Sequence, residues 1–352
     1  MHITSSALLG HIKWLCGRML FEPQWGRRCR KISLYRSAQG VRTLASKQRK
    51  LLSNSLDVGK PIPKLPEELS TSASAPTSEL YTKLAQQSNF SIHRLRITKG
   101  SDGNPIQSSK DISIHSTGLR DQSTIFVKDL GPQISWRTVF IVEYIGPLVI
   151  HPLAYAIRPY IYPSAPSQAS QLQTLSCILI FLHFLKRELE TMFVHRFSAS
   201  TMPARNIFKN SFHYWILAGL NIAAWIYSPL SPTAKPANTI ILSAGLVLYG
   251  VGELWNAYAH LVLSSLRSSG GTERGIPSGF GFGLVTCPNY LAETMSWIGV
   301  YLVSGFSYSV LLFLVVSVGQ MMPWAKKKEN RYRREFGDKY KKKRYTMLPG
   351  IW

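Results

Sequence analysis

The sequence has few acidic residues and few cysteines for its length. Its 352 residues include 18 Asp and Glu against 41 Lys and Arg, which gives a formal net charge of +23 at pH 7. A disulfide framework or a zinc site is not expected, because the cysteines are scattered and form no Cys-x-x-Cys pair. They fit a reducing, cytosol-facing protein, and they are Cys16, Cys29, Cys177 and Cys287.

Several motifs of soluble enzymes are missing as well. The sequence contains no P-loop, no His-Glu-x-x-His motif and no Ser-His-Asp arrangement. The glycines at 279, 281 and 283 follow a G-x-G-x-G spacing, with no preceding strand of a βαβ unit and no acidic residue in a second strand. These absences exclude a Rossmann site, so any nucleotide must be bound by helices.

A net charge this high is typical of nucleic-acid binding, but its distribution argues against that function. Residues 1–50 contain eleven Lys or Arg and one acid, Glu22, and residues 325–344 contain eleven more. Neither cluster lies on a recognisable nucleic-acid motif. The second cluster follows an apolar segment directly, where Lys and Arg mark the cytoplasmic side of a membrane. We therefore expect no nucleic-acid partner.

The first 130 residues are mostly polar and divide into two parts. Residues 1–56 are basic and Ser-rich, a composition that mitochondrial transit peptides share. We expect a disordered N-terminal extension there, because the rest of the chain is typical of an endoplasmic-reticulum protein. Residues 57–130 predict a small α+β domain with a helix over 78–88, a strand over 92–98, a turn and a strand over 123–127. This order resembles a ubiquitin-like fold, and we expect the domain in the cytosol.

Residues 131–352 predict an all-α polytopic membrane domain. Crossing a bilayer takes about twenty residues of helix, and apolar segments of about this length follow one another. Their last member is long enough for two helices hinged near Gly305, so about six transmembrane helices are expected. An even number places both termini on one side, and the basic run after 325 places that side in the cytosol. The segments are 138–157, 172–185, 212–229, 239–263 and 291–324.

The first cluster of polar residues at membrane depth is a stripe in the segment 239–263. Tyr249, Glu253, Asn256 and His260 are spaced four, three and four residues apart, which places them on one face of a helix. Such a stripe either forms hydrogen bonds between packed helices or lines a solvated pocket. The carboxylate favours the pocket, because charged groups retained at this depth usually serve a site.

The second cluster ends the segment 172–185 and continues beyond it. Lys186 and Arg187 are followed there by Glu190 and His195. The two basic side chains could extend to the lipid headgroups. The acidic residues beside them favour an ordered ionic network, which could clamp the phosphates of a nucleotide or of coenzyme A.

The third cluster begins at Cys287-Pro288. Proline suits the first position of a helix, so Asn289, Tyr290 and Glu293 are expected in the first turn, near the membrane surface. A tyrosine at this depth either belongs to an interfacial aromatic belt or has a catalytic role.

Read together, these clusters resemble the trans-2-enoyl-CoA reductases of very-long-chain fatty acid elongation, within the steroid 5α-reductase family. The resemblance covers roughly residues 59–352, and its segments occur in the expected order. The chain departs from the family pattern at Glu329 and Asn330, where related sequences often have His or Arg. The matching segments are 128–140, 185–197, 285–299 and 324–336.

The resemblance implies a role for each of these residues. Tyr290 is implied as the catalytic acid, and Lys186 with Arg187 as the essential basic pair. The residues implied at an NADPH site are Asn256, Asn289, Glu293, Arg331 and Tyr332. The residues expected to line the site are Tyr249, Glu253, His260, Glu190 and His195, and no metal is expected.

The implied reaction is the NADPH-dependent reduction of trans-2-enoyl-CoA at the endoplasmic-reticulum membrane, the last step of the elongation cycle. Hydride adds to Cβ, and Tyr290 protonates Cα, with Lys186 or Arg187 either stabilising the phenolate or holding a phosphate. Elongase partners could dock on the ubiquitin-like domain. Alternatives are a 3-oxo-steroid 5α-reductase or polyprenol reductase, an isoprenylcysteine methyltransferase that uses S-adenosylmethionine, and a membrane scaffold without activity.

Overall fold

The structure is a computed structural model that describes residues 29–36, 62, 65–197, 199–268, 275–341, 343 and 345–351. The described residues form two compact units. The sheet unit contains residues up to 134 together with 201–204, and the helical unit contains residues 135–200 and those from 205 onward.

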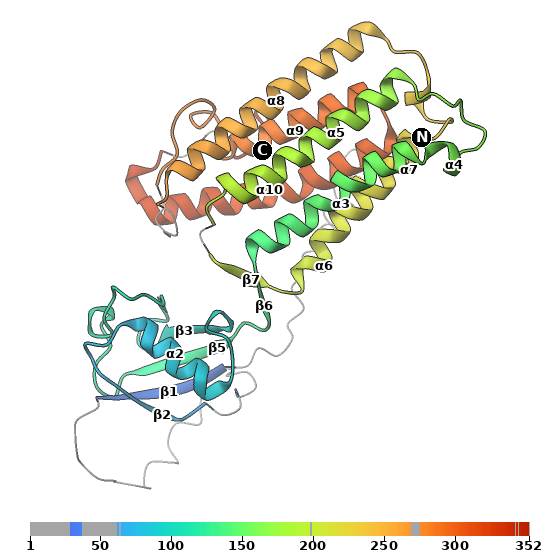
Figure 1. Ribbon diagram of the computed structural model, residues 1–352. Coiled ribbons are helices and arrows are strands. Elements are labelled where there is room, and N and C mark those ends of the chain that lie inside the picture. The colour runs from blue at the N-terminus through green and yellow to red at the C-terminus, as the bar shows by residue number, and fades with distance from the viewer. Residues whose placement is uncertain are drawn as a thin grey trace, which may run out of the picture. The chain divides into compact units, whose positions relative to one another are not determined.

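The sheet unit has a five-stranded sheet with one helix against it (Figure 1). Its strand order is β2-β1-β5-β3-β4, in which β1 runs parallel to β2 and antiparallel to β5. Apolar residues alternate along the strands, so Ile97, Ile125 and Val127 share a buried core with Leu80 and Leu84 of the helix. The elements are β1 (Cys29–Arg36), β2 (Glu68–Thr71), α2 (Thr77–Ser88), η1 (Ile92–Arg94), β3 (Leu95–Lys99), β4 (Pro105–Ile106), η2 (His115–Thr117) and β5 (Thr124–Asp129). A separate two-stranded sheet pairs β6 (Gln133–Ser135) with β7 (Thr201–Pro203).

The helix and the two strands expected between 78 and 127 are confirmed in this unit. The strand expected from 92 begins at Leu95, because Ile92–Arg94 forms a 3-10 turn. The structure differs from the expected extension over 1–56, since Cys29–Arg36 forms β1 and buries Ile32 and Leu34 in the sheet core. The rest of that extension lies outside the described residues. The ubiquitin-like topology stays a prediction.

The helical unit is built from long helices that run side by side (Figure 1). Three of them, α3, α8 and α10, are long and apolar enough to cross a membrane. The prediction of about six transmembrane helices is not confirmed by this finding. Helices α5 and α9, with 19 and 16 residues, are not among the three. The helices are α3 (Trp136–Ala156), α4 (Arg158–Ile161), α5 (Gln171–Leu189), η3 (Glu190–Val194), α6 (Asn206–Ser211), η4 (Phe212–Asn221), α7 (Ile222–Ile226), η5 (Pro232–Ala234), α8 (Thr239–Ser265), α9 (Pro288–Val303), α10 (Tyr308–Phe336) and η6 (Gly337–Lys339).

The hinge expected near Gly305 is confirmed. The chain leaves α9 after Val303, and Gly305 adopts a φ of +65° before α10 begins at Tyr308. A φ in this range is open to glycine without a steric penalty. The single apolar stretch 291–324 therefore folds as two helices.

Among the described residues of the unit, two segments are π-helical, η3 and η4. The wider hydrogen-bond register of a π-helix rotates the side chains that follow it, and such segments often occur at functional sites. The first of them begins at Glu190, one of the residues expected to line the site.

Helices α8 and α9 approach each other backbone to backbone. A Cβ atom added to Gly252 would lie 2.6 Å from Ser296 N and 2.8 Å from Ala292 O. One added to Gly299 would lie 2.7 Å from Gly245 O. Small residues permit this contact in membrane helices, and here it fixes the register of the polar stripe of α8 against α9.

Candidate active site

Lys186 and Arg187 lie at the C-terminal end of α5 and make ion pairs with carboxylates. The Nζ atom of Lys186 is 3.0 Å from Glu253 Oε2 and 3.5 Å from Glu190 Oε1, and it donates to Asn256 Oδ1 at 2.6 Å. Arg187 NH1 donates to Glu190 Oε2 at 2.8 Å. The expected ionic network is therefore present, and α5 supplies its cations.

The polar stripe of α8 faces these cations, with one exception. Glu253 Oε1 is 2.7 Å from His183 Nδ1, and His260 Nδ1 is 2.9 Å from Glu190 Oε2. Tyr249 instead donates to the carbonyl oxygen of Leu179 at 2.7 Å. Of the four residues of the stripe, Tyr249 thus forms an interhelical hydrogen bond to the backbone, whereas the other three join the network.

Helix α9 completes the network from its first two turns. Asn256 Nδ2 donates to the carbonyl oxygen of Asn289 at 2.9 Å and to Glu293 Oε2 at 3.2 Å. Glu293 Oε1 is also 3.2 Å from His183 Nε2. Pro288 begins this helix, as the sequence predicts. We call the whole group the ionic network: His183, Lys186, Arg187, Glu190, Glu253, Asn256, His260 and Glu293.

The charges of the ionic network nearly cancel. Lys186 and Arg187 carry two positive charges against the three negative charges of Glu190, Glu253 and Glu293. His183 contacts two of these carboxylates, and a second proton on its ring, which makes it a cation, would bring the sum to zero. A balanced set of this kind can be retained at membrane depth, where an isolated charge is costly.

Tyr290 lies beside the network and outside its hydrogen bonds. Its ring packs against a cluster of buried residues that includes Cys287, Met321 and Ala325. The structure gives its hydroxyl no hydrogen bond among the residues that it describes. Two cations, Lys328 and Arg187, are within electrostatic range of the phenol. No direct contact between Tyr290 and Lys186 or Arg187 occurs among the described residues.

The other two residues expected at the cofactor site lie on α10. Tyr332 is buried, and its ring centroid lies 5.9 Å from Phe336 and 5.3 Å from Tyr340. Lys328 Nζ lies 5.8 Å from the centroid of the same ring. Arg331 is exposed. The structure therefore brings Tyr332 close to the Lys328 side chain, while no described contact joins Arg331 to the network.

Two residues were missed by the sequence analysis, Tyr144 and Glu143. His183 belongs by sequence to the second polar cluster, but the sequence analysis assigned it no role at the site. Arg187 NH2 donates to the hydroxyl of Tyr144 at 2.9 Å, and the guanidinium carbon lies 5.1 Å from its ring centroid. Glu143, the neighbour of Tyr144 on α3, is 2% exposed. An acidic residue inside a long apolar segment is a signal that could have identified this pair.

His195 belongs to a group whose geometry also suits a metal ion. Ligand atoms of Glu190, His195 and His260 all lie within 4.8 Å of one another. Arg187 NH1, however, is 2.8 Å from Glu190 Oε2 and 3.2 Å from His260 Nδ1. A guanidinium there repels a second cation, so the group is better suited to an ion-paired role than to metal binding.

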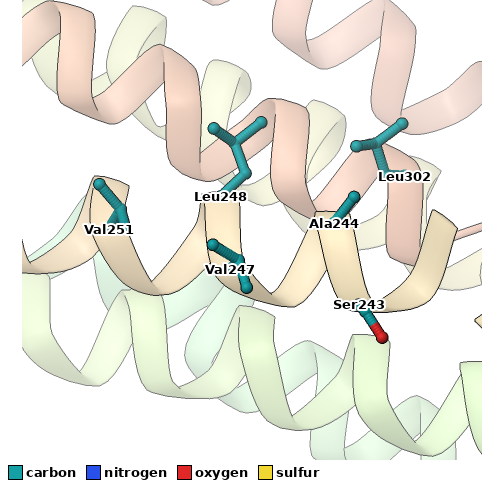
Figure 2. Close-up of a pocket in the computed structure, with 6 residues that line it drawn as sticks. All are labelled: Ser243, Ala244, Val247, Leu248, Val251 and Leu302. Atoms are coloured by element: carbon teal, nitrogen blue, oxygen red, sulfur yellow. The ribbon is translucent and has the colours of Figure 1, made fainter. Parts of the chain in front are cut away.

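An apolar groove of about 510 Å³ lies along α8 (Figure 2). Because a helix turns about 100° per residue, its lining residues face the side of α8 opposite to Glu253 and Asn256. The groove is therefore separate from the ionic network. It is lined by Ser243, Ala244, Val247, Leu248, Val251 and Leu302.

Comparisons with known proteins identify the relatives of this chain. Residues 200–352 match the family described as 3-oxo-5-alpha-steroid 4-dehydrogenase. The chain is 39% identical over 285 residues to the very-long-chain enoyl-CoA reductase of Dictyostelium discoideum, covering 80% of this chain and 93% of that protein. It is 33% identical over 249 residues to the trans-2,3-enoyl-CoA reductase-like protein of Homo sapiens, covering 68% and 67%. The resemblance inferred from the sequence segments is confirmed, and the chain belongs to the very-long-chain enoyl-CoA reductase family.

Proposed function

We propose that the protein reduces the double bond of a trans-2-enoyl-CoA with NADPH and that Tyr290 supplies the proton. The observation that carries this proposal is the ionic network, a group whose charges nearly cancel inside a helical unit with apolar helices, with Tyr290 at its edge. Membership of the enoyl-CoA reductase family supports the reaction, which makes the protein an oxidoreductase acting on a CH–CH bond.

The residues around Asn289 fit the carboxamide end of NADPH. Asn289 is 7% exposed, and its Oδ1 atom has no hydrogen-bond partner among the described residues. A buried acceptor left in this state costs about 1–3 kcal/mol, so a donor is expected to meet it. Asn289, Asn256 and Glu293 would hold the carboxamide, and Arg331 and Tyr332 would bind near the phosphates. When bound, the dinucleotide supplies the hydride that adds to Cβ.

Tyr290 would donate its phenolic proton to Cα of the enolate that hydride addition leaves. The phenolate would then regain a proton from water. A cation close to the phenol makes this transfer easier, because it stabilises the phenolate. Lys186 is engaged by Glu190, Glu253 and Asn256, so we assign this stabilising role to Lys328 and, at longer range, to Arg187.

Several finer features belong to the same proposal. We place the protein in the endoplasmic-reticulum membrane with six transmembrane helices and both termini in the cytosol, supported by the basic residues of α10 that follow its apolar part. The reaction would be the last step of very-long-chain fatty acid elongation. A ubiquitin-like sheet unit would offer a docking surface to other elongase subunits.

The test uses purified protein in detergent with trans-2-hexadecenoyl-CoA and NADPH, and follows NADPH consumption. Wild type turns over, and Tyr290→Phe lowers kcat by about 100-fold or more, the range for loss of a general acid. The matched control is Tyr308→Phe, since Tyr308 is 75% exposed at the start of α10. It keeps wild-type turnover.

Two outcomes would contradict the proposal. Undiminished turnover by Tyr290→Phe removes Tyr290 from the reaction. Absence of enoyl-CoA turnover together with reduction of a 3-oxo-4-ene steroid would favour the alternative function, for which the family match of residues 200–352 is the supporting observation.

A further inference from the structure

Glu329 joins three separate segments of the helical unit at one buried carboxylate oxygen. The residue lies on α10 and is 2% exposed. Its Oε2 atom accepts a hydrogen bond from Thr286 Oγ1 at 2.5 Å and another from the hydroxyl of Tyr340 at 2.6 Å. Thr286 precedes α9, and Tyr340 follows α10. One side chain thus holds the segment before α9 and the segment after α10.

The same two segments are also joined through their backbones. Thr286 N donates to the carbonyl oxygen of Tyr345 at 3.2 Å, and Cys287 N donates to that of Thr346 at 3.0 Å. Met347 is fully buried in the cluster that contains Cys287 and the ring of Tyr290. The end of the chain therefore packs directly against the segment that carries Tyr290.

The carboxylate of Glu329 is held by neutral donors alone. Among the described residues it makes no ion pair, and its second oxygen, Oε1, has no hydrogen-bond partner. Burial, followed by the hydrogen bond to Glu329, raises the pKa of Tyr340 above its ordinary value, so its hydroxyl stays protonated and donates. Burying a polar group is costly unless it is hydrogen-bonded, so the bonds from Thr286 and Tyr340 are what hold this side chain in place.

Tyr290 is only four residues from Thr286, and the intervening chain is stiff. Pro288 fixes one backbone torsion, and Tyr290 N already donates to the carbonyl oxygen of Cys287 at 3.1 Å. On the other side, Lys328 precedes Glu329 on α10. The position of the Glu329 carboxylate therefore sets the distance between the phenol and the cation assigned to it.

We propose that Glu329 is a positioning residue that, through Thr286 and Tyr340, fixes Tyr290 against α10 for proton transfer. The inference rests on the proposed role of Tyr290. It deepens that role, because it explains how a tyrosine without a hydrogen bond of its own is held in place.

The experiment compares Glu329→Gln with Glu329→Leu. Glutamine keeps one carboxamide oxygen, which can accept both hydrogen bonds, because Thr286 and Tyr340 both donate to Oε2 alone. Leucine has no acceptor. Glu329→Gln keeps kcat within about two-fold of wild type, and Glu329→Leu lowers kcat by about ten-fold or more, the scale expected for a displaced catalytic group. The KM for trans-2-hexadecenoyl-CoA stays nearly constant in both. Asp338→Asn, at an exposed acid just after α10, is the control and behaves as wild type.

The solvent deuterium isotope effect on kcat separates positioning from a loss of folded enzyme. A slower proton transfer raises the isotope effect in Glu329→Leu, whereas a smaller folded fraction lowers kcat and leaves the isotope effect unchanged. Tyr340→Phe removes one of the two donors and keeps the test available if Glu329→Leu does not fold. We expect Tyr340→Phe to raise the solvent isotope effect as Glu329→Leu does, with a smaller loss of kcat.

Cys287 gives a readout that does not depend on turnover. It is a fully buried free cysteine beside Thr286. In a variant with the substitutions Cys16→Ser, Cys29→Ser and Cys177→Ser, its maleimide labelling therefore reports on this segment. Faster labelling in Glu329→Leu than in Glu329→Gln supports the proposed positioning role of Glu329. Equal labelling with an unchanged isotope effect overturns the inference. Failure of the proposed function is distinct, since wild type would then lack enoyl-CoA turnover.

Discussion

The helical unit contains two groups of buried polar residues that differ in what they bond. In the ionic network, side chains bond mainly to side chains of opposite charge. In the second group, which we call the carbonyl-bonded cluster, side chains bond mainly to backbone carbonyl oxygens. Its members are His151, Arg158, Gln173 and Thr233.

The carbonyl-bonded cluster completes the hydrogen bonding of a loop. Gln173 Nε2 donates to the carbonyl oxygens of Ile226 and Ser228 at 3.0 and 3.3 Å, and Arg158 NH1 donates to that of Pro166 at 2.7 Å. The carbonyls of Ile226 and Ser228 lie at and just after the end of α7, and that of Pro166 lies in the loop between α4 and α5. Buried backbone carbonyls outside the helices need hydrogen-bond donors of this kind. This difference indicates that polar residues in an apolar helix are structural when they bond to backbone groups. Those that bond to one another are candidates for function.

The largest expected effect comes from opening the ionic network at Arg187. Arg187→Met leaves Glu190 with its charge less compensated, and the expected loss of stability is about 3–5 kcal/mol, as for a broken buried ion pair. Thermal unfolding in detergent measures it. In the double variant Arg187→Met/Glu190→Gln stability returns and turnover does not. A loss below about 1 kcal/mol in the single variant would place the network among surface-like ion pairs.

The next effect concerns the contact that aligns the network. In Gly252→Ala the new Cβ would lie 2.5 Å from Ser296 Oγ, so α8 and α9 must separate. We expect a loss of about 1–3 kcal/mol, typical of overpacking, together with most of the turnover. Gly250→Ala is the matched control, because nothing lies within 4 Å of its new Cβ. Equal damage by both variants would assign the effect to helix α8 alone.

A change in the carbonyl-bonded cluster should affect stability alone. Gln173→Leu leaves the carbonyl oxygens of Ile226 and Ser228 without this donor, at a cost of about 1–3 kcal/mol. Turnover per folded molecule stays at the wild-type value, measured by activity normalised to the folded fraction. Gln171→Leu, at an exposed position of the same helix turn, serves as control. Lower turnover per folded molecule of Gln173→Leu would contradict the claim that the carbonyl-bonded cluster affects stability alone.

The smallest expected effect tests the second tyrosine of the site. Tyr144→Phe removes an acceptor for Arg187, and we expect kcat to fall by about five-fold, in line with one charged hydrogen bond. Tyr155→Phe is the control on the same helix, since its hydroxyl pairs with Thr174 Oγ1 at 2.9 Å. If Tyr144→Phe abolished turnover as completely as is expected of Tyr290→Phe, Tyr144 would replace Tyr290 as the candidate proton donor.

Helical periodicity was the most informative signal in the sequence. It places Glu253, Asn256 and His260 on one face of α8, and the structure brings that face to Lys186 and Arg187 of α5. Spacing along one helix defines a shared face without a partner from another segment. For that reason the sequence predicted most members of the network. It could not predict the bond from Tyr249 to the Leu179 carbonyl or the place of His183 in the network, because both depend on how α5 and α8 pack.

Two other features could not be read from the sequence for different reasons. Strand β1 is a short alternating pattern inside a basic region, and its pairing partners lie dozens of residues away along the chain. The π-helical segment at Glu190 depends on a shift of backbone hydrogen bonds, which side-chain patterns do not record. Tyr144 was missed because an aromatic residue in an apolar segment is common.

Helix α10 is continuous for 29 residues, about 43 Å at 1.5 Å per residue. Its first part is apolar, and its second part carries Lys328, Glu329 and Tyr332. This helix therefore sets the depth of the site in the membrane. The boundary of its apolar part lies at the bilayer surface, and the residues around Tyr290, which pack against α10, lie at a fixed distance from that boundary. A thinner bilayer would tilt the helix, and a thicker bilayer would have to thin around it, so turnover in nanodiscs should vary with lipid chain length.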